Sequence, residues 1–396
     1  MNFVPVIFGG YVNGYSITRT FYETYGIESI ICDCVKNISF YSKMCKQITV
    51  SDPKYNEEKF IHEMENIGKN IREKNIIPII ITTNDQWLIP LSKYRERLEK
   101  YFVYSFSEWN IIEKLTIKKH LYKYCDELNV IYPKTFICSK SEFKDMDLQM
   151  KLPILVKPSE VVDFVSLFPG EKRNYIFNTM DELKSFLKDK FTKGYESSFV
   201  LQEYIPGGVE NLYTITTYSD RKSLKLKGVS IGHKLTQYPK EAGTITSGMT
   251  NFDECLIEPS KKLLETCGYY GITNIEYKYD KRDDKYKLIE INPRPGMWNY
   301  SSYLSGINLF QMMVDDLVLN KDIEYREGRK QFLWTVIPER EILEGIDNEY
   351  KINEVQKLIR ENKVLDPRKN KKDSLKFRFN ILKGDLKLKL SKFIRR

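Results

Sequence analysis

Long apolar runs, paired cysteines and histidine clusters are all missing from this sequence of 396 residues. Its longest apolar run, residues 76–81, includes Pro78 and is far too short to cross a membrane. The seven cysteines form no CxxC pair and only three histidines are present, so the usual zinc-binding patterns are excluded. We expect reduced, mostly buried thiols in a cytoplasmic protein. The first ten residues place no basic stretch before an apolar one, which argues against a signal peptide.

Excess positive charge is also missing from most of the chain, although the net charge is +9. Residues 367–396 hold 12 Lys and Arg against 2 Asp and Glu, whereas the preceding residues hold 51 against 52. The body is therefore almost neutral, and the excess belongs to a basic C-terminal tail. Because the body lacks the basic surface that nucleic-acid binding needs, we expect no nucleic-acid partner.

The first hundred residues alternate between apolar runs and amphipathic stretches. Apolar residues 4–8 and 27–32 flank an amphipathic stretch over 16–25, which predicts parallel strands joined by a helix. The glycines after the first run, Gly9, Gly10 and Gly14, do not form a GxGxxG fingerprint, and no GK[ST] follows. They are compatible with a tight strand-to-helix turn or with contact to a small ligand.

Further along, the periodicity changes to mixed helix and antiparallel strand signals. Residues 109–128 favour one helix, and residues 212–233 favour a hairpin that turns at Ser219-Asp220. The remaining elements are expected as strands at 154–157, 199–204, 273–279 and 286–291, and as helices at 258–267 and 306–317.

Two carboxylates and an amide alternate with apolar residues on the last two of these strands. Glu290 and Asn292 share one face of their strand, and Glu276 lies on the strand before it. Two carboxylates with an amide oxygen make a site suited to Mg²⁺. Arg294 continues the same face and is suited to a phosphate or a developing oxyanion. The alternative is that these are solvent-facing polar positions of an amphipathic sheet.

With its neighbours, this pattern resembles the metal-binding core of the ATP-grasp superfamily of carboxylate–amine ligases. The residues concerned are 271–276 and 288–294, and the resemblance extends over about residues 4–320. It implies that ATP and two Mg²⁺ ions are bound. Lys118 and Lys157 match that family's two nucleotide lysines, and Lys172 or Arg173 would take over charge contacts in the loop that covers the phosphates. The positions implied to hold adenine and ribose are Gln202, Glu203, Tyr204, Ile205 and Glu210.

A narrower similarity is to the bacterial D-aspartate ligases of peptidoglycan side-branch synthesis. It rests on residues 130–135, 157–174 and 232–233, and on the helix start at 306–309. It implies that an amino acid such as D-aspartate is joined to a peptidoglycan precursor peptide. A ligase joining other amino acids or peptides, and a non-catalytic nucleotide-binding scaffold, are the alternatives.

These observations together predict a fold of α/β and α+β parts. The resemblance implies an ATP-grasp fold behind an N-terminal Rossmann-like pre-ATP-grasp domain. The expected divisions are an N-terminal domain at 1–108, a first lobe at 109–205, a second lobe with the metal site at 206–330, and a C-terminal extension at 331–396.

The expected chemistry is amide formation through an acyl phosphate, at the expense of ATP. Arg294 and Lys157 are the first candidates for stabilising the charge that develops. His233 and Lys234, at the end of a strand, are candidates for contacting the acid or the acyl phosphate. We expect an amino acid and an amine acceptor as substrates, and a cytoplasmic location that includes the inner face of the membrane.

The basic tail alternates cations with apolar residues. A period of two allows a small hairpin turned at residues 383–385, whereas Leu382, Leu386, Leu390 and Phe393 would share one face of a helix. Either form suits peripheral contact with an anionic membrane. The alternative is an edge element packed on the body with solvated lysines.

Overall fold

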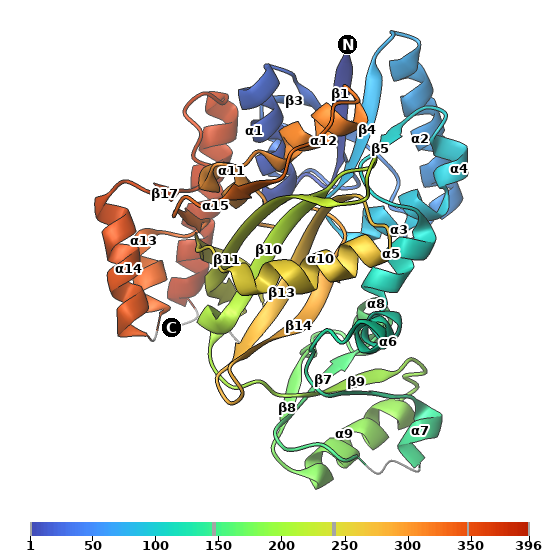
Figure 1. Ribbon diagram of the computed structural model, residues 1–396, viewed down its shortest axis with the longest axis vertical. Helices are drawn as coiled ribbons and strands as arrows, with labels where there is room; N and C mark the ends of the chain where they lie inside the picture. The colour runs from blue at the N-terminus through green and yellow to red at the C-terminus, as the bar shows by residue number, and fades with distance from the viewer. Residues whose placement is uncertain (1, 145–147, 240–242, 347, 395–396) are drawn as a thin grey trace.

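Three sheets follow one another along the long axis of the protein, as a computed structural model shows (Figure 1). The structure describes all residues except 1, 145–147, 240–242, 347 and 395–396. The parallel sheet lies at one end and a small antiparallel sheet lies at the other, with a large mixed sheet between them.

The N-terminal sheet is parallel in every pairing, with strand order β3-β2-β1-β4-β5. The predicted parallel α/β domain is therefore confirmed. Gly9, after the first strand, has φ of +97°, and a Cβ there would lie 2.1 Å from Thr83 Oγ1, so this tight turn requires glycine. The elements are β1 (Phe3–Phe8), α1 (Val12–Tyr25), β2 (Ser29–Asp33), η1 (Ile38–Tyr41), β3 (Cys45–Thr49), α2 (Glu57–Arg72), β4 (Ile77–Thr82), α3 (Asp85–Lys93), α4 (Arg95–Leu98) and β5 (Val103–Tyr104).

The segment predicted as one helix over 109–128 consists of two helices, α5 (Trp109–Thr116) and α6 (Lys118–Leu128). Ile117 between them has an extended backbone, with φ of −78° and ψ of 114°. Both residues at 116–117 are β-branched, which weakens the helix preference at this point, although the β-branched pair Ile111-Ile112 remains helical within α5. The break matters for the site because Lys118 becomes the first residue of α6.

A small antiparallel lobe follows, with strand order β6-β9-β7-β8. It has a hydrophobic core of its own, in which Phe164, Leu187 and Phe199 are fully buried. In Figure 1 this lobe lies below the rest of the molecule. Its elements are β6 (Thr135–Cys138), α7 (Lys140–Lys144), β7 (Ile154–Pro158), α8 (Val161–Leu167), β8 (Tyr175–Phe177), α9 (Met180–Thr192) and β9 (Phe199–Glu203).

The large sheet is built around two antiparallel hairpins, as predicted. Its order is β14-β13-β10-β11-β12-β16-β17, and β15 pairs with β11. In chain order, the elements of this part as far as β15 are η2 (Val209–Asn211), β10 (Leu212–Ser219), β11 (Leu226–Tyr238), β12 (Thr244–Thr250), η3 (Glu254–Leu256), α10 (Ile257–Thr266), β13 (Gly271–Asp280), β14 (Lys285–Asn292), α11 (Tyr300–Ser305), α12 (Leu309–Leu317) and β15 (Arg326–Gly328).

The C-terminal extension completes this sheet and then returns to the N-terminal domain. It contains β16 (Leu333–Thr335), α13 (Glu339–Glu344), α14 (Glu349–Arg360), β17 (Val364–Leu365) and α15 (Leu375–Ile394). The hairpin considered for the tail is wrong, because the tail forms the helix α15. No helix in the described part of the chain is long and apolar enough to span a membrane. The predicted domain boundaries stay predictions. The boundary predicted between residues 330 and 331 falls within the large sheet, which includes strands on both sides of it.

Candidate active site

Glu276 and Glu290 lie directly opposite each other on the paired strands β13 and β14. Side chains of directly opposed residues share a face of the sheet, so the two carboxylates are neighbours. Asn292 Nδ2 donates a hydrogen bond to Glu290 Oε1 at 3.0 Å. The structure thus brings together the three residues predicted to hold Mg²⁺.

Lys234 reaches this carboxylate pair from β11. Its Nζ lies 2.9 Å from Glu276 Oε2, and its side chain is almost fully buried. The pairing explains how a lysine can remain inside the sheet face, since an unpaired buried charge would be costly. Lys234 is therefore at the predicted site.

His233 is not at the site. Successive residues of a strand point to opposite faces, so the residue beside Lys234 faces the other side of the sheet. There its ring lies 5.4 Å from that of Tyr213, and neither ring nitrogen has a hydrogen-bond partner in the described chain. Burial lowers the pKa of His233 to about 3, so the ring is neutral. The sequence interpretation named two adjacent strand residues, and the pleat allows only one of them onto the sheet face that bears the carboxylate pair.

Arg294 is held at the edge of the carboxylate pair by two partners. Its Nε donates to Asp85 Oδ1 at 2.7 Å, and its Nη2 donates to Asn292 Oδ1 at 2.9 Å. Asp85 is the first residue of α3 in the N-terminal domain. The sequence analysis missed its role, although its place after a parallel strand is where ligand-contacting residues of such sheets gather.

The two predicted nucleotide lysines face the same carboxylates. Burial lowers the pKa of Lys118, but Tyr122, Glu290 and Glu276 act against it and the net shift is upward. Burial, followed by the nearby charge of Lys118, lowers the pKa of Lys157 to about 8. These opposite shifts are expected where two cations lie close together beside carboxylates and compete for protons.

All three lysines of the site affect the pKa of Glu290. Burial raises the pKa of its carboxyl group, yet Lys118, the hydrogen bond from Asn292, Lys234 and Lys157 outweigh burial and lower it. Lys118 belongs to α6, Lys157 to the small lobe and Lys234 to the large sheet. Residues from three separate segments therefore converge on one carboxylate.

The residues predicted to hold adenine lie at the hinge between the small lobe and the large sheet. The side-chain amide of Gln202 is buried and donates to Tyr122 Oη and Thr135 Oγ1, both at 2.9 Å, so it has a structural role. Tyr204 N donates to Pro153 O. The Ile205 amide N–H has no acceptor among the described residues and is available to a ligand.

Charged residues beside this hinge were not foreseen from the sequence. Lys278 Nζ donates to Ile205 O at 2.7 Å and to Gly207 O at 3.1 Å. Burial lowers the pKa of Lys278, and the nearby charge of Glu210 partly opposes this shift. Glu203 is engaged by Arg282, whose Nη2 lies 2.8 Å from Glu203 Oε1. Lys278 thus holds the hinge backbone from strand β13, and Arg282, in the turn after β13, holds the Glu203 side chain.

Lys172 and Arg173 are exposed on the loop between α8 and β8. Neither has an ion-pair partner in the part of the chain that the structure describes. Among the described residues, no contact links Lys172 or Arg173 to Lys118 or Lys157. Their assignment to the phosphates therefore stays a prediction.

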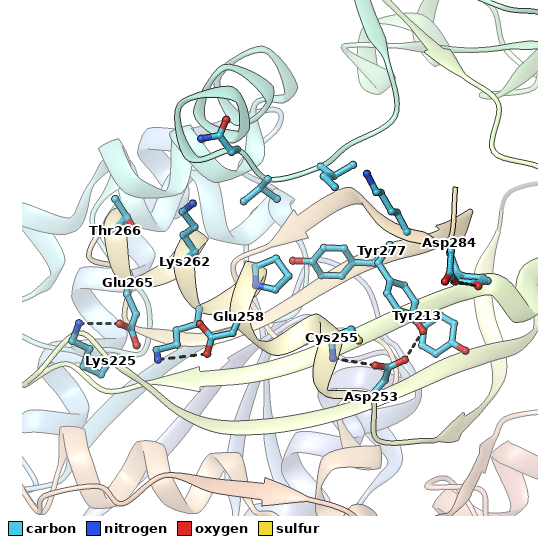
Figure 2. A pocket seen from close by; sticks show the side chains of 18 residues that line it. Tyr213, Lys225, Asp253, Cys255, Glu258, Lys262, Glu265, Thr266, Tyr277 and Asp284 are labelled. Atoms are coloured by element: carbon cyan, nitrogen blue, oxygen red, sulfur yellow. Dashed lines mark hydrogen bonds and ion pairs between the residues drawn. The ribbon is translucent and has the colours of Figure 1, made fainter. Parts of the chain in front are cut away.

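A cavity lies elsewhere, on the opposite face of the large sheet. It has a volume of about 1030 Å³ and lies between α10 and the outer ends of β13 and β14. Figure 2 shows Tyr213 and Tyr277 at this cavity, together with Asp253 and Glu258. Since Tyr277 alternates with Glu276, this cavity and the carboxylate pair are on different sides of the sheet.

The donor chemistry of the carboxylate pair fits the predicted metal. Two carboxylates and one amide offer hard oxygen atoms, which Mg²⁺ prefers, and the expected remaining positions belong to phosphate oxygens and water. No cluster of three or more His, Cys, Asp or Glu side chains suited to a metal occurs among the described residues.

Comparison with known proteins gives consistent results. Residues 236–337, which include the carboxylate pair, match a family model described as ATP-grasp in the biosynthetic pathway with Ter operon. An L-amino acid ligase from Bacillus licheniformis superposes with a TM-score of 0.59 at 16% identity, covering 80% of this chain and 74% of that one. The chain has the ATP-grasp fold. The prediction of that fold with a Rossmann-like N-terminal domain is confirmed.

Two further similarities concern activity and ligands. The chain is 29% identical over 380 residues to D-aspartate ligase of Enterococcus faecium, which covers 91% of this chain and 89% of the relative. The chain also superposes on the biotin carboxylase domain of a 2-oxoglutarate carboxylase from Hydrogenobacter thermophilus, which was crystallised with magnesium ADP. The TM-score is 0.59 at 15% identity, and the superposition covers 83% of this chain and 72% of that one. The chain thus resembles ATP-dependent ligases, as predicted, and proteins of the same fold have been crystallised with magnesium and adenine nucleotide.

Proposed function

We propose that the protein is an ATP- and Mg²⁺-dependent carboxylate–amine ligase. The observation that supports this best is the convergence of Lys118, Lys157 and Lys234 on the Glu276–Glu290 pair. Such a mixture of cations and carboxylates suits a triphosphate, whose charge needs both lysines and a metal for neutralisation. A sheet surface that only faced solvent would not draw these residues from separate segments.

The proposed nucleotide site lies between the small lobe and the large sheet. Lys118 and Lys157 would contact the phosphates, and the free Ile205 amide would donate to the adenine ring. Glu276, Glu290 and Asn292 would hold Mg²⁺, which supplies positive charge to the phosphate oxygens when it is bound. The presence of two ions, rather than one, is part of the proposal.

The proposed reaction has two steps. An oxygen of the acid substrate attacks the γ-phosphorus of ATP, and ADP leaves. The amine nitrogen then attacks the acyl carbon, phosphate leaves, and the nitrogen gives up a proton. Lys234 and Arg294 lie beside the carboxylate pair and are suited to the negative charge that develops on oxygen in both steps.

For the substrate, we propose an amino acid such as D-aspartate and a peptidoglycan precursor peptide as the amine acceptor. The similarity to D-aspartate ligase over nearly the whole chain supports this choice. Such a precursor implies a cytoplasmic location near the inner face of the membrane. A ligase that joins other amino acids or peptides is the second candidate, supported by the superposition on an L-amino acid ligase.

The test is ADP release in the presence of ATP, Mg²⁺ and a panel of D- and L-amino acids, with and without a cell-wall precursor peptide. We expect D-aspartate to stimulate release more than L-aspartate. Equal stimulation by both, or preference for an unrelated acid, contradicts the substrate and leaves the ligase assignment intact. If nucleotide binds but no acid stimulates ADP release, the protein is a nucleotide-binding scaffold instead.

A further inference from the structure

The last helix, α15, has apolar side chains on two opposite faces. The inner face packs on the N-terminal domain, where the ring of Phe377 stacks on Tyr15 at 4.3 Å and Ile381 is buried beside it. Figure 1 shows α15 at the rim of the molecule. The outer face leaves four large apolar side chains in solvent, with exposed fractions of 78% at Leu375, 67% at Phe379, 66% at Leu382 and 63% at Leu386.

These four residues, called here the outer stripe, form one continuous line along the helix. They follow at intervals of four, three and four residues, which keeps them within an arc of about 60° on an α-helix. Scattered exposed apolar residues are ordinary, but a contiguous line of four is typical of an interaction surface. The inner face already fixes α15 to the body, so folding of the chain does not explain the outer stripe.

Cations border the outer stripe on both sides. Helical spacing places Lys376 and Lys383 along one flank and Arg378 along the other, and all three are exposed. None of them has a carboxylate within ion-pair distance among the described residues. The outer face of α15 is therefore an apolar line between two cationic margins.

The two acidic residues of the same segment are either buried or paired. Asp373 is buried, and its Oδ2 accepts hydrogen bonds from Tyr15 at 2.9 Å and Ser42 at 2.7 Å. Asp385 is paired with Arg368, whose Nη1 lies 3.0 Å from its Oδ1. Asp373 is thus buried, and the charge of the partly exposed Asp385 is neutralised by Arg368, so neither adds an unpaired negative charge beside the outer stripe.

From this arrangement we infer that the outer stripe and its cations bind the surface of an anionic lipid membrane. Side chains of this kind insert at the boundary between headgroups and acyl chains, while the flanking cations contact anionic headgroups. Charge complementarity favours lipid over a second copy of this chain, because two copies facing each other would bring like charges together. The contact is peripheral and reversible, and it does not depend on the proposed ligase activity.

The experiment uses the full chain and vesicles of mixed phosphatidylcholine and phosphatidylglycerol, with phosphatidylcholine vesicles for comparison. Co-sedimentation is expected with the anionic vesicles at low salt, and high salt should weaken it. Each cation near an anionic surface contributes a factor of roughly five, so the triple variant Lys376→Gln/Arg378→Gln/Lys383→Gln should bind about a hundredfold more weakly. Replacing the outer stripe with serine should lower binding at least about tenfold.

Matched variants separate this face from general charge. Lys59→Gln/Lys69→Gln/Lys74→Gln removes three exposed lysines from the α2 region and should leave vesicle binding unchanged. All replaced residues are exposed, so the melting temperatures of the variants should match that of the parent. Equal binding to neutral vesicles, unchanged binding after loss of the outer stripe, or no binding at all overturns the inference. So does a lipid-free dimer that the serine variant converts to monomer, because the stripe would then join two copies.

Discussion

At the scale of single residues, Glu290 is the group on which the site converges. We expect Glu290→Gln to lower Mg²⁺-dependent ADP release by about a hundredfold or more, because a neutral amide replaces a metal-binding carboxylate. Packing should survive, since glutamine is nearly isosteric and can still accept the hydrogen bond from Asn292. Thermal unfolding and ADP release measure the two effects separately, with the exposed Glu258→Gln as the control. Near-normal release from Glu290→Gln would show that the metal assignment is wrong.

Lys157 gives the site a pH dependence. Burial and the charge of Lys118 lower its pKa to about 8, so the cation is present below that pH and is lost above it. If only the protonated lysine binds the phosphates, the affinity for ATP should fall about tenfold between pH 7 and pH 9. Calorimetric titration without added metal measures this affinity.

The control for this prediction is Lys157→Arg, because a guanidinium stays charged over the whole range. Its affinity for ATP should be flat between pH 7 and pH 9. A parent protein whose affinity is equally flat would mean that Lys157 does not contact the phosphates.

Whether a site residue could be predicted from the sequence depends on how far along the chain its contact partners lie. Glu276, Glu290 and Asn292 were predicted correctly as neighbours, because strand alternation and a short hairpin determine their faces. The prediction failed for His233, since strand alternation places one of two adjacent residues on the face of the carboxylate pair and does not say which. Asp85 was missed because its contact with Arg294 joins residues far apart in sequence, and only the packing of the N-terminal domain on the large sheet creates it.

At the scale of elements, the predicted strands and helices lie close to the observed ones, and the differences have local causes. The helix over 109–128 breaks at Ile117, and this break cannot be read from apolar periodicity, nor from β-branching alone, since the pair Ile111-Ile112 stays helical. The sequence of the tail was compatible with a hairpin or a helix, because its apolar residues fit both the strand period of two and the helical period of about 3.6. Burial of Phe377 and Ile381 against Tyr15 decides for the helix, and that contact is not visible in the sequence of the tail.

The pairing of β11 with β12 depends on a glycine on the face that bears the site. A Cβ on Gly232 would lie 2.4 Å from Met249 O and 2.4 Å from Trp298 Cη2, so the indole ring packs directly on the bare strand. We expect Gly232→Ala to destabilise the protein by about 1–3 kcal/mol through this overpacking. Urea unfolding measures the change.

Gly384→Ala is the comparison, because no atom lies within 4 Å of the added Cβ and the position is inside α15. Alanine favours a helix, so this variant should be neutral or more stable by up to about 1 kcal/mol. If Gly232→Ala were equally harmless, the close packing of Trp298 on β11 would be incorrect.

At the scale of the whole molecule, the two ends of the chain are joined through one buried carboxylate. Asp373, just before α15, accepts hydrogen bonds from Tyr15 Oη at 2.9 Å, Ser42 Oγ at 2.7 Å and Lys43 N at 3.0 Å. Arg19 adds a bond from Nη1 to Pro367 O at 2.8 Å. The C-terminal extension is therefore held on the N-terminal domain as well as in the large sheet.

We expect Asp373→Ala to lower the free energy of unfolding by about 2–4 kcal/mol, because it leaves buried donors at Tyr15 and Ser42, and a partly buried one at Lys43, without an acceptor. Limited proteolysis should then cut the segment before α15 faster than in the parent. Asp385→Ala is the matched control, since Asp385 is partly exposed and Arg368 keeps its bond to Asp366 at 2.8 Å. That control should cost less than about 1 kcal/mol. Equal losses from the two variants would mean that Asp373 acts as an ordinary surface charge and does not join the two ends.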